Sequence, residues 1–226
     1  MLLELLFVAP LFALAWVVAI ILSLTVHEFA HALVGKWRGD DTAEKMGRLT
    51  LNPLAHLDPV GTLMLLFVGF GWAKPVPFDP RNLQSPAWDG VAIAFAGPAA
   101  NLFLATLAAV VFRNLAEMNF AQDSLLPIFL ILLVYTNLLL LMFNMLPIPP
   151  LDGSKVIDAI FYRTRYEMIA HWLNLYGPRI LLGLVIVSLV IPQVNVFGFI
   201  QAPAILACDE MTATSCFGTL DASLGE

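Results

Sequence analysis

Residues 5–35 read LLFVAPLFALAWVVAIILSLTVHEFAHALVG, an apolar stretch that is free of charge up to Val26 and then contains His27, Glu28 and His31. Residues 5–26 are long enough to cross a bilayer, because a spanning helix needs roughly 20 mainly apolar residues. The HExxH pattern His27-Glu28-Phe29-Ala30-His31 follows at once. If the helix continues to Gly35, His27 lies roughly 12 Å inside its end at about 1.5 Å per residue. The stretch therefore predicts a transmembrane helix that carries ionisable side chains at membrane depth.

The whole chain is rich in apolar residues and poor in charge. Of its 226 residues, 60% are hydrophobic and 12% are charged, and the mean hydropathy is +0.85. Soluble domains carry about a quarter charged residues, so this composition excludes an ordinary soluble domain and makes the lipid bilayer a partner. The net charge of -6 includes no long run of either sign, and nothing in it indicates nucleic-acid binding.

Three further charge-free stretches, residues 90–112, 124–151 and 180–208, can also cross a membrane. The apolar stretch 61–73 is shorter and would reach only about 20 Å as a helix, against a hydrocarbon core of roughly 30 Å. It contains Gly61, Gly69 and Gly71, and prolines flank it. We expect an all-α polytopic membrane protein with four transmembrane helices, plus a short membrane-dipping segment of bent or extended backbone, with possible β-strands, between the first two.

The positions of the basic residues predict an orientation. With four crossings, the connections 36–86 and 153–179 share one side of the membrane, and only Arg113 lies opposite. The positive-inside tendency places these connections in the cytoplasm and both termini outside. We therefore expect a multi-pass protein of the cell membrane whose polar site faces the cytoplasmic side. The basic residues of the two connections are Lys36, Arg38, Lys45, Arg48, Lys74, Arg81, Lys155, Arg163, Arg165 and Arg179.

The length favours one domain over residues 1–226, with a core at about 25–153 and a C-terminal helix and extracytoplasmic tail at 178–226. The first apolar stretch lacks a basic segment before it and runs into HExxH, so we expect it to be a retained helix and not a cleaved signal peptide. Cys208 and Cys216 lie in the expected tail. They either form a disulfide in an oxidising exterior or are incidental thiols of a disordered tail.

HExxH places two imidazoles on one helix face. His27 and His31 are four residues apart and can reach one metal ion, while Glu28 lies beside them for a water molecule at that ion. A chance match, or a capping or interfacial pair at a helix end, is the alternative. Because ionisable groups in an apolar helix are costly and usually functional, Glu28 favours the metal site. Catalytic zinc commonly has three protein ligands and one open position, so a third ligand is needed.

Asp152 is the candidate for that ligand. It ends the stretch NMLPIPPLDG, residues 144–153, in which three prolines prevent regular helix and Gly153 permits unusual backbone angles. Such a segment can direct a carboxylate into a cavity. The alternative is an ordinary turn in which Asp152 caps a helix that starts at Ser154. Beside HExxH, we favour ligation.

Three other polar residues have two interpretations each. Asn144 is either an interhelical hydrogen-bonding residue or a donor to the substrate strand and developing oxyanion. Asn101, in Gly97-Pro98-Ala99-Ala100-Asn101, is favoured as a packing residue, with support of a metal ligand as the alternative. For His56, we favour a role with Asp58 in a proline-rich turn over a role in substrate positioning or as an auxiliary electrophile.

HExxH, then GPxxN, then NxxPxPxLDG, each in a separate expected span, together resemble the site-2 protease family of intramembrane zinc metalloproteases. The resemblance covers about residues 25–153, and residues 47–62 with 73–77 resemble a compact subgroup without PDZ and CBS modules. It implies that His27, His31 and Asp152 bind one Zn²⁺ per chain, that Glu28 is the general base, and that Asn144 lies near the scissile peptide.

The sequence thus predicts a zinc-dependent endopeptidase that hydrolyses peptide bonds within or near transmembrane segments of protein substrates. A metal transporter would also place His and Asp at membrane depth, but its ligands would normally be distributed along a path. An inactive zinc-binding pseudoprotease would have no need of Glu28. The sequence does not indicate an oligomeric state.

Overall fold

The computed structural model describes every residue except 1, 119–123, 192, 219 and 221–226. The described part of the chain is all-α, and four of its helices are long and apolar enough to cross a membrane. These are α2 (Pro10–Trp37), α5 (Pro86–Glu117), α6 (Leu125–Asn144) and α8 (Glu167–Val190). The shorter helices are α1 (Leu2–Val8), α3 (Thr42–Lys45), α4 (Pro59–Val68), α7 (Ser154–Phe161) and α9 (Gly198–Thr212), with 3₁₀ turns η1 (Pro53–Ala55) and η2 (Pro80–Asn82).

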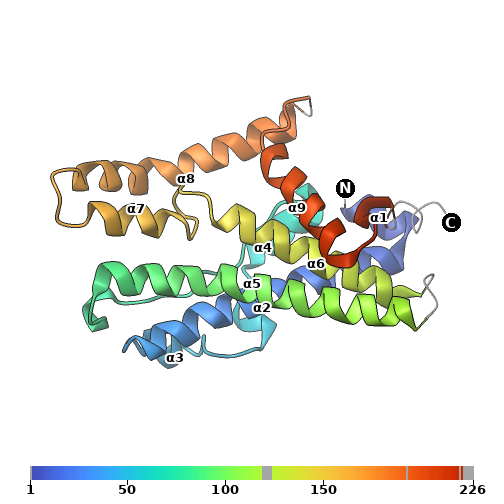
Figure 1. Cartoon of the computed structure of the whole chain (residues 1–226). Helices are drawn as coiled ribbons and strands as arrows, with labels where there is room; N and C mark the ends of the chain where they lie inside the picture. The colour runs from blue at the N-terminus through green and yellow to red at the C-terminus, as the bar shows by residue number, and fades with distance from the viewer. Residues whose placement is uncertain (1, 119–123, 192, 219, 221–226) are drawn as a thin grey trace.

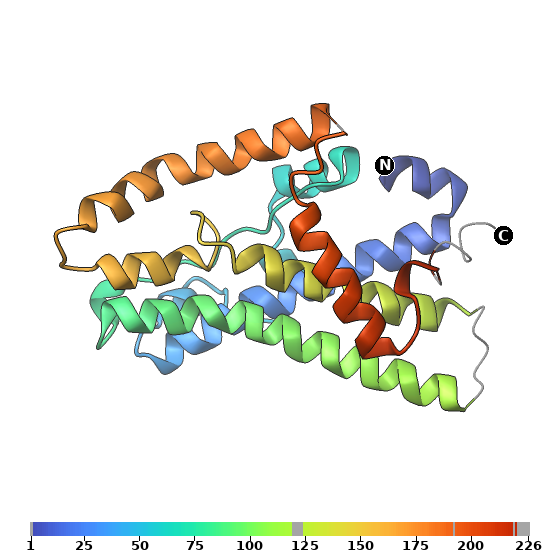
Figure 2. The same cartoon turned by 45° about the horizontal axis from the view of Figure 1, so that its top comes forward.

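Helices α2, α5 and α6 run side by side and form the centre of the molecule (Figures 1 and 2). Small residues let them approach closely, as is common where helices pack in lipid. The buried core includes Ala15 and Ala19 of α2, Ala105 of α5 and Ile131 of α6. Helix α9 packs across α6 and also contacts α5. Helix α3 and the α7–α8 connection lie at one end of the bundle, and α1 lies at the other (Figure 1).

The expected fourth span is wrong in its boundaries. The apolar stretch 180–208 is divided between two helices: α8 begins earlier, at Glu167, and ends at Val190, and α9 is a separate helix. The expected alternative of a disordered tail also fails, because Cys208 and Cys216 form a disulfide and both are fully buried. Helix α8 packs against α7, and its Gly177 lies so close to Pro149 that an added Cβ would come within 2.8 Å of the proline ring.

The β-strands considered between the first two spans are absent from the described residues, which contain only an isolated antiparallel bridge between Leu57 and Ala73. Much of the short apolar stretch is instead helix α4, which is capped by Asp58 through a 2.8 Å bond from the N–H of Gly61. At 10 residues, α4 is too short to cross. The chain returns along it, and a Cβ on Gly71 would lie 2.3 Å from the carbonyl oxygen of Gly61.

Asp40 fastens the end of α2 to the segment that leads into α5. Its buried carboxylate accepts hydrogen bonds from the N–H of Thr42 (3.1 Å), the N–H of Asp79 (2.7 Å) and the side-chain amide of Asn82 (2.8 Å). Burial raises the pKa of the Asp40 carboxyl, but the hydrogen bonds from Asn82, Thr42 and Asp79 outweigh burial and lower it overall. The connection between α2 and α5 is therefore held across the end of the bundle where the polar site lies.

Candidate metal centre

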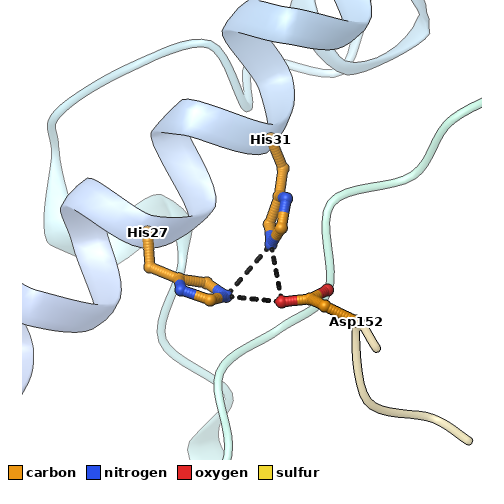
Figure 3. Close-up of side chains that lie close together, drawn as sticks. All are labelled: His27, His31 and Asp152. Carbon is orange, nitrogen blue, oxygen red and sulfur yellow. Dashed lines mark hydrogen bonds and ion pairs between the residues drawn. The ribbon is translucent and has the colours of Figure 1, made fainter. Parts of the chain in front are cut away.

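The two histidines of HExxH project from one face of α2 toward Asp152, which comes from the loop after α6 (Figure 3). The Nε2 atoms of His27 and His31 are 3.0 Å apart. Oδ2 of Asp152 lies 3.2 Å from Nε2 of His27 and 3.4 Å from Nε2 of His31. Both imidazoles are more than nine-tenths buried. The structure thus brings together the three residues that the sequence singles out as ligands.

Partners on α5 determine which nitrogen of each imidazole faces this cluster. Nδ1 of His31 lies 2.7 Å from the carbonyl oxygen of Ile93, which can only accept, so Nδ1 carries the proton and Nε2 has a free lone pair. Nδ1 of His27 lies 2.5 Å from Oδ1 of Asn101. The side chain of Asn101 therefore contacts His27 directly, which is the geometry that the alternative interpretation, support of a metal ligand, requires. The two residues are 74 positions apart, so a local sequence pattern cannot predict their contact.

The loop that carries Asp152 is folded back on the end of α6. The N–H of Gly153 donates to the carbonyl oxygen of Asn144 at 2.7 Å, and a Cβ on Gly153 would lie 2.3 Å from the carbonyl oxygen of Met145. Only glycine allows this approach. The turn directs Asp152 toward α2. Its Oδ2 atom is buried and has no hydrogen-bond partner among the described residues, although Nε2 of each imidazole lies within 3.4 Å of it.

The three atoms fit a tetrahedral metal ion. Ligand atoms about 2.0–2.1 Å from zinc lie about 3.3 Å apart in a tetrahedron, and the observed separations are 3.0, 3.2 and 3.4 Å. Gly97 of α5 completes the cradle, since a Cβ at this position would come within 2.5 Å of Cε1 of His27 and of Nε2 of His31. His27, His31 and Asp152 are also the single group of metal-capable side chains found among the described residues.

Glu28 is buried next to His27 on α2, and its Oε2 atom accepts a 3.2 Å hydrogen bond from the N–H of Val76. Arg48, which the sequence reading did not single out, is buried nearby and donates to the carbonyl oxygen of Lys74. Burial lowers the pKa of the Arg48 guanidinium, and the charge of Glu28 opposes that shift. Residues 74–76 therefore lie between a buried cation and the carboxylate of HExxH.

His56 and Asn144 do not join the metal cluster. His56 is 1% exposed, its Nε2 lies 2.8 Å from the carbonyl oxygen of Thr50, and its own carbonyl oxygen accepts from the N–H of Lys74 at 2.7 Å. These bonds lie in the segment just before α4, which Asp58 caps. The side-chain amide of Asn144 donates to the carbonyl oxygen of Leu140 in its own helix at 3.0 Å.

The sequence reading also passed over Asn137 and Ser23. Both are fully buried and lie behind Asn101, on the side away from His27. Asn137 could have been singled out from the sequence, because a polar amide in the middle of an apolar span needs a hydrogen-bond partner in lipid.

Comparison with known proteins agrees with these motifs. The model of Peptidase family M50 matches residues 15–125, which include HExxH and Asn101 but not Asp152. The chain is 46% identical over 148 residues to a Bacillus subtilis (strain 168) protein named "Putative zinc metalloprotease YwhC", covering 64% of this chain and 68% of that protein.

Two mycobacterial proteins named "Putative zinc metalloprotease Rip2" are also similar. The one from Mycolicibacterium smegmatis is 35% identical over 144 residues, and the one from Mycobacterium tuberculosis (strain H37Rv) is 32% identical over 150 residues. Each match covers 61% of this chain and 54% of the relative, so the chain spans about half the length of these relatives. No solved structure matches the chain significantly. On the family match and the similarity to YwhC, the chain belongs to Peptidase family M50, the site-2 protease family.

Proposed function

We propose that the protein is a zinc-dependent endopeptidase that cleaves membrane-protein substrates within or near their transmembrane segments. The observation that carries the proposal is the triangle of Nε2 of His27, Nε2 of His31 and Oδ2 of Asp152, with sides of 3.0–3.4 Å, directly beside Glu28. Residues 1–226 would act as one domain around this site, with one Zn²⁺ per chain. The names of YwhC and Rip2 support the same activity.

His27, His31 and Asp152 would hold the zinc ion, which when bound acts as a Lewis acid on the peptide carbonyl and makes water more acidic. Glu28 takes a proton from the attacking water and then delivers it to the leaving amine. Val76 orients the Glu28 carboxylate through its N–H. Asn101 and the carbonyl of Ile93 hold the imidazoles so that both Nε2 atoms face the metal.

A peptide bond inside a transmembrane helix is already hydrogen-bonded, so the substrate must unwind before cleavage. We propose that residues 47–51 and 73–78 receive the unwound strand by backbone pairing. His56 would support this surface, because its carbonyl oxygen already holds the N–H of Lys74. Asn144 donates one amide proton to the carbonyl of Leu140 and would use the second as an oxyanion donor.

We propose that the protein crosses the cell membrane with the metal centre toward the cytoplasm and both termini outside. The basic residues of α3 and of the α7–α8 turn lie at one end of the bundle (Figure 1), and the positive-inside tendency favours the cytoplasm for such residues. The disulfide is part of the same buried cluster as Leu130, which lies near the start of α6, and disulfides persist in oxidising surroundings. A membrane-impermeant maleimide should label Glu117→Cys in intact cells, and Lys45→Cys only after permeabilisation, in a background without the native cysteines.

The activity is tested with purified protein and a membrane-protein substrate in vesicles. Wild type should cleave, while Glu28→Ala and chelator-treated protein should not, although Glu28→Ala should retain zinc. Glu44→Ala serves as the matched control, because Glu44 is exposed and pairs with Lys36 away from the site. Cleavage by Glu28→Ala would overturn the mechanism. Zinc binding without cleavage by wild type would favour a pseudoprotease, and zinc flux across the vesicles would favour a transporter.

A further inference from the structure

A chain of hydrogen bonds leads from His27 into the apolar interior of the bundle. Oδ1 of Asn101 lies 2.5 Å from Nδ1 of His27, and Nδ2 of Asn101 donates to Oδ1 of Asn137 at 2.7 Å. Nδ2 of Asn137 donates to Oγ of Ser23 and to the carbonyl oxygen of Leu133, both at 2.8 Å. The hydroxyl of Ser23 donates to the carbonyl oxygen of Ala19 at 2.7 Å.

The direction of this chain is determined at its far end. The carbonyl oxygens of Leu133 and Ala19 can only accept, so Asn137 must present its amino group to Leu133, and Ser23 must give its proton to Ala19. Oδ1 of Asn137 then faces Asn101 and requires a donor there. Asn101 must therefore present its amino group to Asn137 and its carbonyl oxygen to His27, which places the imidazole proton on Nδ1.

The geometry points to Asn137, supported by Ser23, as a positioning residue that acts through Asn101 to keep Nε2 of His27 free for a metal ion. This inference rests on the proposed metal site. Without Asn137, the Asn101 amide could rotate and present its amino group to His27. That rotation would oppose a proton on Nδ1 and so disfavour metal binding through Nε2. Orienting partners of metal-bound histidines commonly change metal affinity 10- to 100-fold.

Because the hydrogen-bonded residues are buried, each of them must keep its partner. Asn137 and Ser23 are 0% exposed and Asn101 is 1% exposed, so an unpaired polar atom here would have no water to compensate it. The amino group of Asn137 has two acceptors, Ser23 and the carbonyl of Leu133, and the amino group of Asn101 donates to Asn137. The neighbouring Thr136 differs, because it is also buried in α6 but its Oγ1 atom has no hydrogen-bond partner in the described part of the chain. Thr136 therefore provides a control for the general effect of substituting a buried polar residue in this helix.

The test compares Asn137→Leu, Asn137→Asp and Thr136→Val in detergent-purified full-length protein. Zinc affinity is measured by chelator competition, and the thermal midpoint of the metal-free protein reports folding. Asn137→Leu should weaken zinc binding about 10-fold. Asn137→Asp, which this apolar site would keep protonated, retains an oxygen that accepts from Asn101 and a hydroxyl that donates to the carbonyl of Leu133. It should stay within about threefold of wild type, as should Thr136→Val. Equal affinity of Asn137→Leu and wild type, with both folded, would overturn the inference.

A second measurement uses the wild-type protein, so it does not depend on the folding of a variant. The ¹⁵N and ¹³C imidazole shifts of His27 in metal-free wild type report which nitrogen is protonated in the neutral ring. A proton on Nδ1 supports the inference, and a neutral ring protonated mainly on Nε2 contradicts it. His27→Ala separates this result from the proposed function: if that substitution leaves zinc affinity unchanged, the metal site itself is wrong, whereas a large loss beside an unaffected Asn137→Leu refutes only the role of Asn137.

Discussion

The backbone N–H of Val76 donates to Oε2 of Glu28 over 3.2 Å and so joins the return segment after α4 to the carboxylate of HExxH. The neighbours of Val76 are Pro75 and Pro77, which have no N–H, and the N–H of Lys74 is already held by the carbonyl of His56. Within this short segment, the N–H of Val76 is therefore the donor that reaches Glu28.

Removing that donor should lower cleavage without removing the metal. Val76→Pro deletes the N–H, and loss of a hydrogen bond to a charged group costs about 1.5–3 kcal/mol, so we expect kcat to fall about 10-fold or more while zinc content stays constant. Val76→Ala keeps the N–H and should remain within about twofold. A rate for Val76→Pro equal to that of Val76→Ala would show that the bond does not assist Glu28.

Gly97 allows α5 to pass directly behind the metal-facing atoms of His27 and His31. Gly97→Ala would place a methyl group 2.5 Å from both rings, so the imidazoles or the helix must shift. We expect zinc affinity to fall at least about 10-fold, as for other disturbances of ligand orientation. Gly90→Ala on the same helix has no atom within 4 Å and is the control. Isothermal titration with zinc distinguishes them, and equal affinities would contradict the cradle.

Asp40 should make the free energy of unfolding depend on pH. Its folded-state pKa is lowered from 3.8, so its contribution is present above that pH and is lost as the pH falls through the lowered pKa. Asp40→Asn should destabilise the protein by about 1–3 kcal/mol at pH 6. The difference from wild type should shrink below about pH 4. Thermal unfolding of wild type and Asp40→Asn across this pH range measures the difference, and Asp41→Asn, at a half-exposed neighbouring residue, is the control. If the difference in stability does not change with pH, the Asp40 carboxylate is not its cause.

The disulfide should stabilise the C-terminal part of the fold, because it joins α9 to the residues that follow it. Cys208 and Cys216 are separated by 8 residues, and closing so short a loop contributes about 2.5 kcal/mol by the chain-entropy relation. The double substitution Cys208→Ala and Cys216→Ala should lower the free energy of unfolding by about this amount. Reducing agent should destabilise wild type similarly and leave the double variant unchanged. An effect of the reductant on the variant would locate the cause elsewhere.

The features that could be predicted from sequence are those with a fixed local period or a rare residue in lipid. The four-residue spacing of His27 and His31 on a helix dictates a shared face, and Asp152 stands out as a carboxylate after an apolar span. The fourth span was misplaced because residues 191–207 are as free of charged residues as the end of α8, while Glu167 and Arg179 made the start of α8 look too charged.

The contacts that could not be predicted join distant helices. An asparagine in a span needs a partner, but composition does not say which neighbour provides it, so Asn101 was taken for packing and Asn137 was missed. The glycines of the short segment were taken for bent or extended backbone. They instead allow the return chain to lie on α4, at Gly61 and Gly71, and that close approach depends on tertiary packing.

Helix α5 contributes no ligand atom to the cluster, yet Ile93 and Asn101, two turns apart on it, orient both histidines, and Gly97 between them leaves room for the rings. Grafting HExxH and an aspartate onto two helices of another scaffold would therefore reproduce the donor atoms without their alignment. The smallest transferable copy of this centre is a three-helix unit with the Asp152 loop attached, and its design should begin from the helix that never touches the metal.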